Sequence, residues 1–189
     1  MKKNFGNKLV MAPLPVLIVA TYDEEGVPNA MNVAWGGQCA DNCIALNLST
    51  SHKTTANIRI NKAFTVCIAD RAHLDIADYF GIVSGRDEDK ITKTGVNVEN
   101  SLYVSAPIFI DFPLTFECRL LSIEEGLEQV RVVGEVINMQ ADDSILDERG
   151  KVDFGKLQVL SFDPSSNKYR LLGDVVGNAF KDGAKIKNK

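Results

Sequence analysis

The amino-acid sequence predicts a mainly β protein, an antiparallel barrel with short helical insertions. Apolar and polar residues alternate along several segments, which is the period of two of a half-buried strand. Two such segments of about ten residues each flank a short acidic turn, and hairpins of that length belong to large sheets or barrels. Closure is the economical arrangement for six or more antiparallel strands, because a closed barrel has no exposed edges.

The N-terminal part of the chain predicts three strands. Residues 16–21 are apolar and β-branched and end in acidic turn residues, so residues 29–33 can return antiparallel to them. Two glycines follow Trp35, and we expect the chain to leave the strand there and form a loop. Apolar side chains occupy every second position of residues 43–49, which predicts a half-buried strand.

The middle of the chain predicts two short helices with a strand between them. A turn rich in Ser and Thr, residues 49–55, leads into a helix that ends near Asn61. Residues 63–69 alternate as a strand does, and residues 74–83 carry apolar side chains at helical spacing. The charged segment 84–95 is expected to be an ordered loop or lid, because loops of this length in compact domains are usually functional or disordered.

The C-terminal part contains the clearest local pattern, a long hairpin. Residues 114–120 alternate, residues 124–128 form an acidic turn, and residues 130–139 return. A short helix is predicted within residues 142–150, followed by a late apolar stretch at 157–162. Two or three helices are therefore expected in all.

Length and composition limit the class of protein. The chain has 189 residues, 45% hydrophobic and 24% charged, which predicts a single domain over residues 1–189. A formal net charge of −4 offers no basic field, so we expect no nucleic-acid partner, and the Lys-rich tail 181–189 is interpreted as a solvated, frayed end. The longest apolar run, residues 16–20, is too short for a bilayer, so we expect a cytoplasmic protein without a membrane segment.

The four cysteines predict neither disulfides nor a metal site. Cys67 and Cys118 lie singly inside predicted strands, where a thiol behaves as a small buried hydrophobe. Cys39 and Cys43 have no second cysteine pair and no histidine at ligand spacing.

Residues 49–55 are the best candidate for an anion site. A helix start offers unpaired N–H groups and the positive end of the helix dipole. Here hydroxyl and basic side chains surround that start: Ser51, His52, Lys53, Thr54 and Thr55. The alternative is that a Ser or Thr only caps the helix and Lys53 is solvated. The segment lacks a GxxxxGK[ST] pattern, so it is not a P-loop.

Other patterns speak against hydrolytic chemistry. His52 and His73 are the only histidines, and neither belongs to a nucleophile motif. The paired acidic residues fall in turns, where solvated charge is the simpler interpretation. Trp35 before two glycines is either a core or interface residue or a platform that lets a planar ring approach the backbone. No catalytic residue is predicted.

An ordered series of short motifs runs over almost the whole chain. The series comprises Pro13-Leu14-Pro15-Val16, Gly26, Asn29, residues 32–35, 49–58, 64–66, 78–81, 84–87, 89–90, 94–95 and 134–136, Tyr169, and Leu172-Gly173. In order and spacing it resembles the flavin reductase-like family, in its flavoredoxin-like branch. The resemblance implies an FMN-binding split β-barrel with an antiparallel, Greek-key-like topology.

The resemblance also implies which residues bind FMN. The isoalloxazine edge would follow Asn32, Val33, Ala34 and Trp35, and the ring and ribityl chain would follow Asn47, Leu48 and Ser49. The phosphate would be held by Ser51, His52, Lys53 and Thr54, the segment that the helix-start argument indicates independently. Lys90 would reach towards the flavin, the alternative being a solvated loop lysine.

The function implied is that of an FMN-binding flavoprotein oxidoreductase of the NAD(P)H-dependent flavin reductase type, with FMN favoured over FAD. The alternative is a flavoredoxin-like electron carrier whose tightly bound FMN is reduced by a partner protein. The acidic surface of this chain would suit a basic partner. A third interpretation is a β-barrel binding module without flavin. No residue distinguishes NADH from NADPH.

The resemblance further implies a homodimer with flavin near the subunit interface. Phe109 and Phe112 are candidate exposed apolar residues for that interface. Residues 31–34 lack the small hydroxyl side chains of short free-flavin reductases, which favours flavin as a bound prosthetic group.

Overall fold

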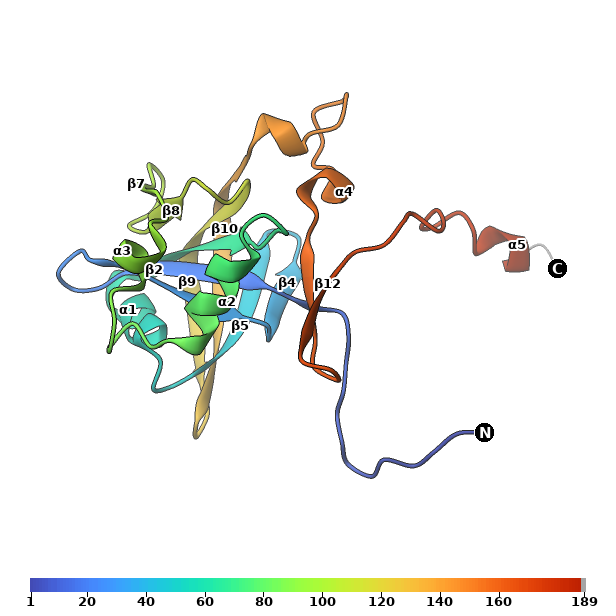
Figure 1. Cartoon of the computed structure of the whole chain (residues 1–189), viewed down its shortest axis with the longest axis horizontal. Helices are drawn as coiled ribbons and strands as arrows, with labels where there is room; N and C mark the ends of the chain where they lie inside the picture. The colour runs from blue at the N-terminus through green and yellow to red at the C-terminus, as the bar shows by residue number, and fades with distance from the viewer. Residues whose placement is uncertain (188–189) are drawn as a thin grey trace.

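Seven strands form the main sheet of the computed structural model, which describes residues 1–187. Their order is β3, β2, β6, β9, β10, β5, β4, and every neighbouring pair is antiparallel. They are β2 (Leu17–Tyr22), β3 (Pro28–Val33), β4 (Gly36–Ala40), β5 (Cys43–Ser49), β6 (Ala63–Ile68), β9 (Leu114–Glu125) and β10 (Gln129–Ala141). The sheet curls around an apolar interior (Figure 1), so the prediction of a mainly β, antiparallel barrel is confirmed.

Two smaller sheets and short helices surround the barrel. One sheet contains β1 (Leu14–Pro15), β11 (Leu160–Asp163) and β12 (Lys168–Leu171), and the other contains β7 (Val98–Asn100) and β8 (Pro107–Phe109). The helices are α1 (Lys53–Asn61), α2 (Leu74–Ile82), α3 (Lys90–Thr94), α4 (Phe154–Leu157), α5 (Ala184–Lys187) and the 3-10 turn η1 (Asp143–Ile145). None of the helices within residues 1–187 is long and apolar enough to span a membrane.

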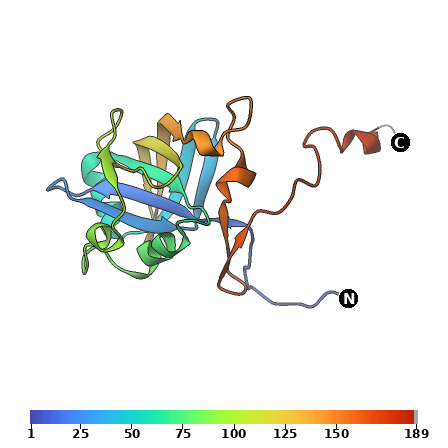
Figure 2. The same ribbon diagram turned by 45° about the horizontal axis from the view of Figure 1, so that its top comes forward.

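Strand β2 is buried on both faces, which explains its continuous apolar sequence. Leu17 and Val19 point into the barrel interior, where they join Leu46, Phe64 and others. The alternate residues Ile18 and Ala20 join a second core cluster on the other face, under α2 and β8. Helix α2 therefore covers this outer face of the barrel (Figure 2), whereas Ile58 of helix α1 joins the interior cluster.

Glycine allows close packing at two strand positions. A Cβ on Gly134 would lie 2.4 Å from the Phe64 ring, so only glycine lets that ring fill the barrel. A Cβ on Gly36 would lie 2.8 Å from Leu46 Cδ2 and 2.9 Å from the Ala45 carbonyl oxygen. Glycine at 36 thus lets β4 lie directly against β5, and the prediction that this segment is a loop is wrong.

Other local predictions also need correction. The segment predicted as an ordered loop or lid, 84–95, contains helix α3, which begins where the Asp89 carboxylate caps the N–H groups of Ile91 and Thr92. Within residues 1–187 five α-helices form where two or three were expected, and strands β7, β8 and β12 were not predicted. Strands of three or four residues are too short to show a periodicity.

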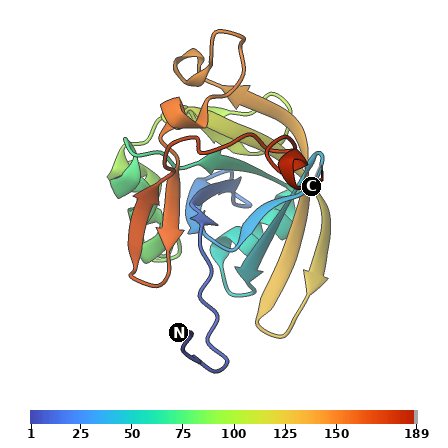
Figure 3. The same ribbon diagram turned by 90° about the vertical axis from the view of Figure 1, so that its right-hand side faces the viewer.

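Phe109 and Phe112 do not lie on the surface. They are 0% and 3% exposed, packed in the core cluster beneath α2 and β8, so the prediction that they serve a subunit interface is wrong. The tail expected to be frayed is exposed but ends in the short helix α5, and residues 188–189 lie outside the described part. Both chain ends extend from one side of the barrel, the side that faces the viewer in Figure 3.

Candidate functional site

The start of helix α1 presents hydrogen-bond donors that no backbone acceptor within residues 1–187 uses. His52 stands at the N-cap in an extended conformation, and Ala56 is the first residue whose N–H bonds back, to the His52 carbonyl. In the described part of the chain the N–H groups of Lys53, Thr54 and Thr55 have no backbone acceptor. The first turn holds no acidic residue, so unpaired donors and the positive end of the dipole stay available.

His52 does not cap the helix with its side chain; its ring turns back towards strand β5. The backbone N–H of Ser49 donates to His52 Nδ1 at 3.2 Å, so the neutral ring carries its proton on Nε2. Burial, and then the positive charge of Lys90, lower the pKa of His52. A neutral imidazole with one free N–H donor therefore stands at the helix start.

Lys53 and Thr54 are held by partners from the β2–β3 hairpin. Lys53 Nζ lies 3.1 Å from Asp23 Oδ2, and Asn29 Nδ2 donates to Thr54 Oγ1 at 3.1 Å. Asn29 in turn touches Gly85, where a Cβ would lie 1.9 Å from Asn29 Oδ1. The hairpin thus orients two site residues and brings the chain after α2 against them.

Lys90 is buried, so the alternative of a solvated loop lysine is wrong. Only 4% of the residue is exposed, and Nζ donates to the carbonyls of Phe80 at 3.1 Å and Val83 at 3.0 Å. Burial, and then the nearby Lys53 charge, lower the pKa of Lys90 from 10.5 to about 8. The carbonyls at the end of α2 therefore hold a cation beside the start of α1.

These residues line a cavity of about 290 Å³, which we call the α1 cavity. It unites six of the predicted site residues: Asn32, Ser51, His52, Lys53, Thr54 and Lys90. Met31 and the segment from Phe80 to Gly85 also line it and were not predicted as site residues. The chain after α2 contributes backbone and small side chains, for which a sequence pattern offers no chemical signal.

A second cavity of about 240 Å³, which we call the Trp35 cavity, adjoins the first. It shares Asn32, Gly81 and Ile82 with the α1 cavity and adds Ala34, Trp35, Asp78, Phe162 and Tyr169. Trp35 is 63% exposed at its mouth. A ring bound here would lie along β3 between aromatic side chains.

Polar contacts fix the walls of the Trp35 cavity. The Tyr169 hydroxyl donates to Asp78 Oδ1 at 2.7 Å, and Asn32 Nδ2 donates to the Ala77 carbonyl at 2.9 Å. Burial, and then Asp78, raise the pKa of Tyr169 to about 12, so it stays a hydrogen-bond donor. Strand β12 is thereby joined to helix α2 across the cavity.

The other predicted site residues, Val33, Asn47, Leu48 and Ser49, line neither cavity. Val33 and Leu48 are buried in the barrel core, so their side chains face away from both cavities. Asn47 donates two hydrogen bonds to the Trp35 carbonyl, one from its backbone N–H at 2.8 Å and one from Nδ2 at 3.4 Å. These bonds position Trp35. Ser49 Oγ lies 2.9 Å from Ser51 Oγ and supports the turn before α1.

The chemistry of these walls fits a flavin mononucleotide. The α1 cavity has a cluster of N–H, hydroxyl and ammonium donors that suits one phosphate, and the adjoining Trp35 cavity has aromatic and amide groups that suit a planar ring. Among residues 1–187, no three His, Cys, Asp or Glu side chains come together in an arrangement that holds a metal ion.

Comparison with known proteins identifies the family. Residues 10–157 match the flavin reductase like domain, and the chain belongs to that family. It is 30% identical to the uncharacterized Escherichia coli (strain K12) protein YddH over 152 residues, which are 77% of this chain and 80% of that one. The family assignment made from the motifs is therefore confirmed, and it supports a flavin-binding protein of the oxidoreductase type.

Solved structures agree with this assignment. Flavoredoxin of Desulfovibrio vulgaris (Miyazaki F) is 34% identical, with a TM-score of 0.92 over 97% of this chain and 100% of that one. A protein with a split barrel domain from Shewanella frigidimarina, at 16% identity, has a TM-score of 0.79 over 88% of this chain and 86% of that one, which shows the shared fold. The expected split-barrel fold and the flavoredoxin-like resemblance are both confirmed.

Proposed function

We propose that this protein is an FMN-binding flavoprotein oxidoreductase that keeps FMN as a prosthetic group. One observation carries the proposal: an anion-binding helix start and an aromatic cavity adjoin each other and share Asn32. A nucleotide with a single phosphate spans such a pair of cavities. The similarity to flavoredoxin over 97% of the chain supports the same interpretation.

In this proposal the start of α1 anchors the phosphate. The backbone N–H groups of the first turn, the Ser51 and Thr54 hydroxyls and the Lys53 ammonium would donate to phosphate oxygens. His52 would add its Nε2–H without adding charge. Lys90 lines the α1 cavity, where its ammonium would offset negative charge on the phosphate.

The Trp35 cavity would orient the ring. The backbone of residues 32–35 offers donors and acceptors along one edge, with Asn47 fixing the Trp35 carbonyl. When bound, FMN supplies the redox chemistry, accepting a hydride or single electrons. The protein's own part is to bind, orient and exclude water, so no side chain is assigned as a general acid or base.

The electron donor distinguishes two versions of the proposal. In the first, NADH or NADPH reduces the bound flavin directly, as in a flavin reductase. In the second, which the similarity to flavoredoxin favours, a partner protein supplies the electrons, and a net charge of −4 suits a basic partner. The four free cysteines suit a reducing cytoplasm, and a homodimer is the assembly that we propose.

The test is an anaerobic visible spectrum of the FMN-saturated protein before and after NADH, and then NADPH, is added. We expect a stoichiometric flavin spectrum before addition. Prompt loss of flavin absorbance would establish the nicotinamide-dependent version and name its donor, whereas an oxidised spectrum that only dithionite bleaches would establish the carrier version. A colourless protein that takes up no added FMN would refute both.

A further inference from the structure

The walls of the two adjoining cavities carry opposite charge. Of the eight residues that line the Trp35 cavity in the described part of the chain, only Asp78 has a charged side chain. In the wall of the α1 cavity the charged side chains are the ammonium groups of Lys53 and Lys90, and no lining residue from the described range is acidic. A single negative charge therefore stands at the end of the site where the proposed function puts the flavin ring.

The carboxylate of Asp78 is held in place by a neutral donor. The Tyr169 hydroxyl donates to Asp78 Oδ1 at 2.7 Å, and this bond joins helix α2 to strand β12, which lie side by side (Figure 3). The Tyr169 ring packs on Phe162, with the ring centroids 6.1 Å apart. None of the ion pairs formed within residues 1–187 includes Asp78. The negative charge is therefore fixed in the cavity wall without a cation beside it.

A fixed negative charge acts unequally on the two oxidation states of a bound flavin. The oxidised ring is neutral. When it takes up two electrons and one proton, the reduced ring carries one negative charge, so a carboxylate in the cavity wall repels the reduced form alone. At the effective dielectric constant of a protein surface, repulsion between charges several ångströms apart changes an equilibrium constant roughly tenfold.

We propose that Asp78 lowers the reduction potential of the bound flavin by repelling the reduced ring, and that Tyr169 moderates this effect through its hydrogen bond to the carboxylate. This inference rests on the proposed function, because it needs FMN with its ring in the Trp35 cavity. Asp78 transfers no proton and forms no bond to FMN; its charge alone acts. The two electrons come from a nicotinamide or from a partner protein, and a flavin with a lowered potential is the stronger reductant towards its acceptor.

The test is the midpoint potential of bound FMN, measured anaerobically at mildly alkaline pH with dithionite and a reference dye. Asp78→Asn removes the charge but keeps an oxygen that can accept from Tyr169. We expect this variant to bind reduced FMN, relative to oxidised FMN, roughly tenfold more tightly than the wild type does, which raises the potential by about 30 mV. Its affinity for oxidised FMN should change little, because the oxidised ring has no charge.

Two further variants of helix α2 serve as controls. Asp75→Asn removes the same charge from the same helix, at an exposed residue that lines neither cavity, and should leave the potential at the wild-type value. Asp78→Glu keeps the charge in the wall and should keep the low potential. These two variants separate the effect of a charge at the ring from that of net charge or of a changed helix surface.

Tyr169→Phe should act in the opposite direction. It leaves the Asp78 carboxylate without its donor, so reduced FMN should bind roughly threefold more weakly relative to oxidised FMN, and the potential should fall by about 15 mV. If the hydrogen bond between Tyr169 and Asp78 only shaped the cavity, the two variants that alter it would change the potential in the same direction.

Each outcome decides between the proposals. A potential that Asp78→Asn leaves unchanged, that Asp75→Asn raises equally, or that Asp78→Asn and Tyr169→Phe shift in the same direction would overturn the inference on Asp78. Stoichiometric FMN binding in the same samples would still uphold the flavin proposal. A wild-type protein that binds no FMN would overturn both.

Discussion

The α1 cavity and the Trp35 cavity adjoin each other but are assembled from different parts of the chain. Every residue that lines the α1 cavity falls within residues 10–157, the part that matches the family domain. The Trp35 cavity takes Phe162 and Tyr169 from strands β11 and β12, beyond that part. The α1 cavity therefore rests on the shared domain, and the Trp35 cavity is completed by a C-terminal sheet outside it; under the proposed function these are the anion-binding end and the ring end of one site.

The two cavities also differ in polarity. The α1 cavity holds two ammonium groups, each placed by the chain: Lys53 beside Asp23, and Lys90 on the carbonyls of α2. The Trp35 cavity has an exposed indole and one hydroxyl–carboxylate hydrogen bond. Under the proposed function, the α1 cavity recognises the phosphate and the Trp35 cavity recognises the ring. Riboflavin has the ring without the phosphate, so comparing the affinities for FMN and riboflavin separates the contributions of the two cavities to binding.

The largest effect is expected from replacing Lys53 and Thr54 together by Ala. The change removes one charge-assisted and one neutral hydrogen bond, together worth about 3 kcal/mol, or roughly a 100-fold loss of FMN affinity. Riboflavin, which has no phosphate, should bind the variant and the wild type equally. Both affinities are measured by quenching of flavin fluorescence.

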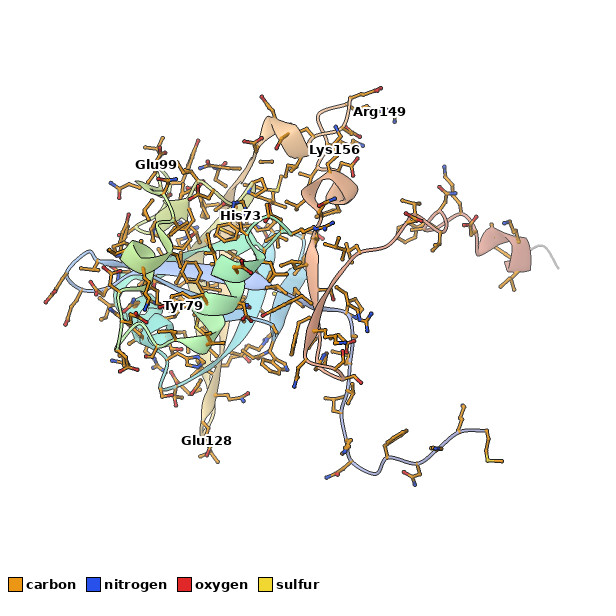
Figure 4. All side chains as sticks on the ribbon, viewed as in Figure 1. His73, Tyr79, Glu99, Glu128, Arg149 and Lys156 are labelled. Carbon is orange, nitrogen blue, oxygen red and sulfur yellow. The ribbon has the colours of Figure 1, made fainter. Side chains whose placement is uncertain are left out.

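The control for this double variant is Lys151→Ala, which removes an exposed lysine in the loop near Arg149, far from α1 (Figure 4). We expect wild-type affinity for both flavins. FMN affinity that stays unchanged in the double variant would remove α1 from the site, and an equal loss for riboflavin would show that α1 contacts the ring.

A smaller effect, a change of about 2 kcal/mol in the free energy of unfolding with pH, is expected from the titration of Lys90. Its pKa is about 8 in the folded protein and 10.5 unfolded, so the folded state disfavours the ammonium form. Between these values the unfolded state binds more protons, and the free energy of unfolding rises with pH. Relative to Lys90→Met, the wild type should therefore gain roughly that amount from about pH 7 to about pH 9.5, measured by urea unfolding.

The comparison variant isolates this effect, because other groups that titrate in the same range are common to both proteins. The Met side chain keeps an unbranched apolar stem like that of Lys and lacks the ammonium group. Parallel stability curves for the two proteins would contradict the lowered pKa of Lys90 and would show that its burial does not disfavour the ammonium form.

The sequence predicted the barrel strands well because their burial imposes a period of two. Residues 43–49, 114–120 and 130–139 were predicted as strands, and the structure places all three in the main sheet. Strand β4 was missed because its signal is glycine: a residue that usually releases a chain here allows contact with Leu46 and Ala45. Phe109 and Phe112 were misplaced because an apolar residue outside a periodic segment carries no information on which way it faces.

The candidate site was predicted unevenly for a related reason. Residues 51–54 combine a helix start with donors, a local pattern that a sequence shows directly, and the structure brings them into one cavity. The carbonyls that hold Lys90, and the contact of Tyr169 with Asp78, join residues 7 to 91 positions apart. Such contacts follow from the tertiary fold, and no periodicity encodes them.

The smallest effect is expected from Tyr169→Phe, at the part of the ring end that lies outside the family domain. The change removes one half-buried hydroxyl from Asp78, a hydrogen bond worth about 1 kcal/mol, while the aromatic ring stays in the cavity wall. FMN and riboflavin affinities should therefore fall together, less than about fivefold. Tyr103→Phe, at an exposed tyrosine on the β7–β8 connection, should change neither. A loss confined to FMN would place Tyr169 at the phosphate, and the division of the site into an anion-binding end and a ring-binding end would then be wrong.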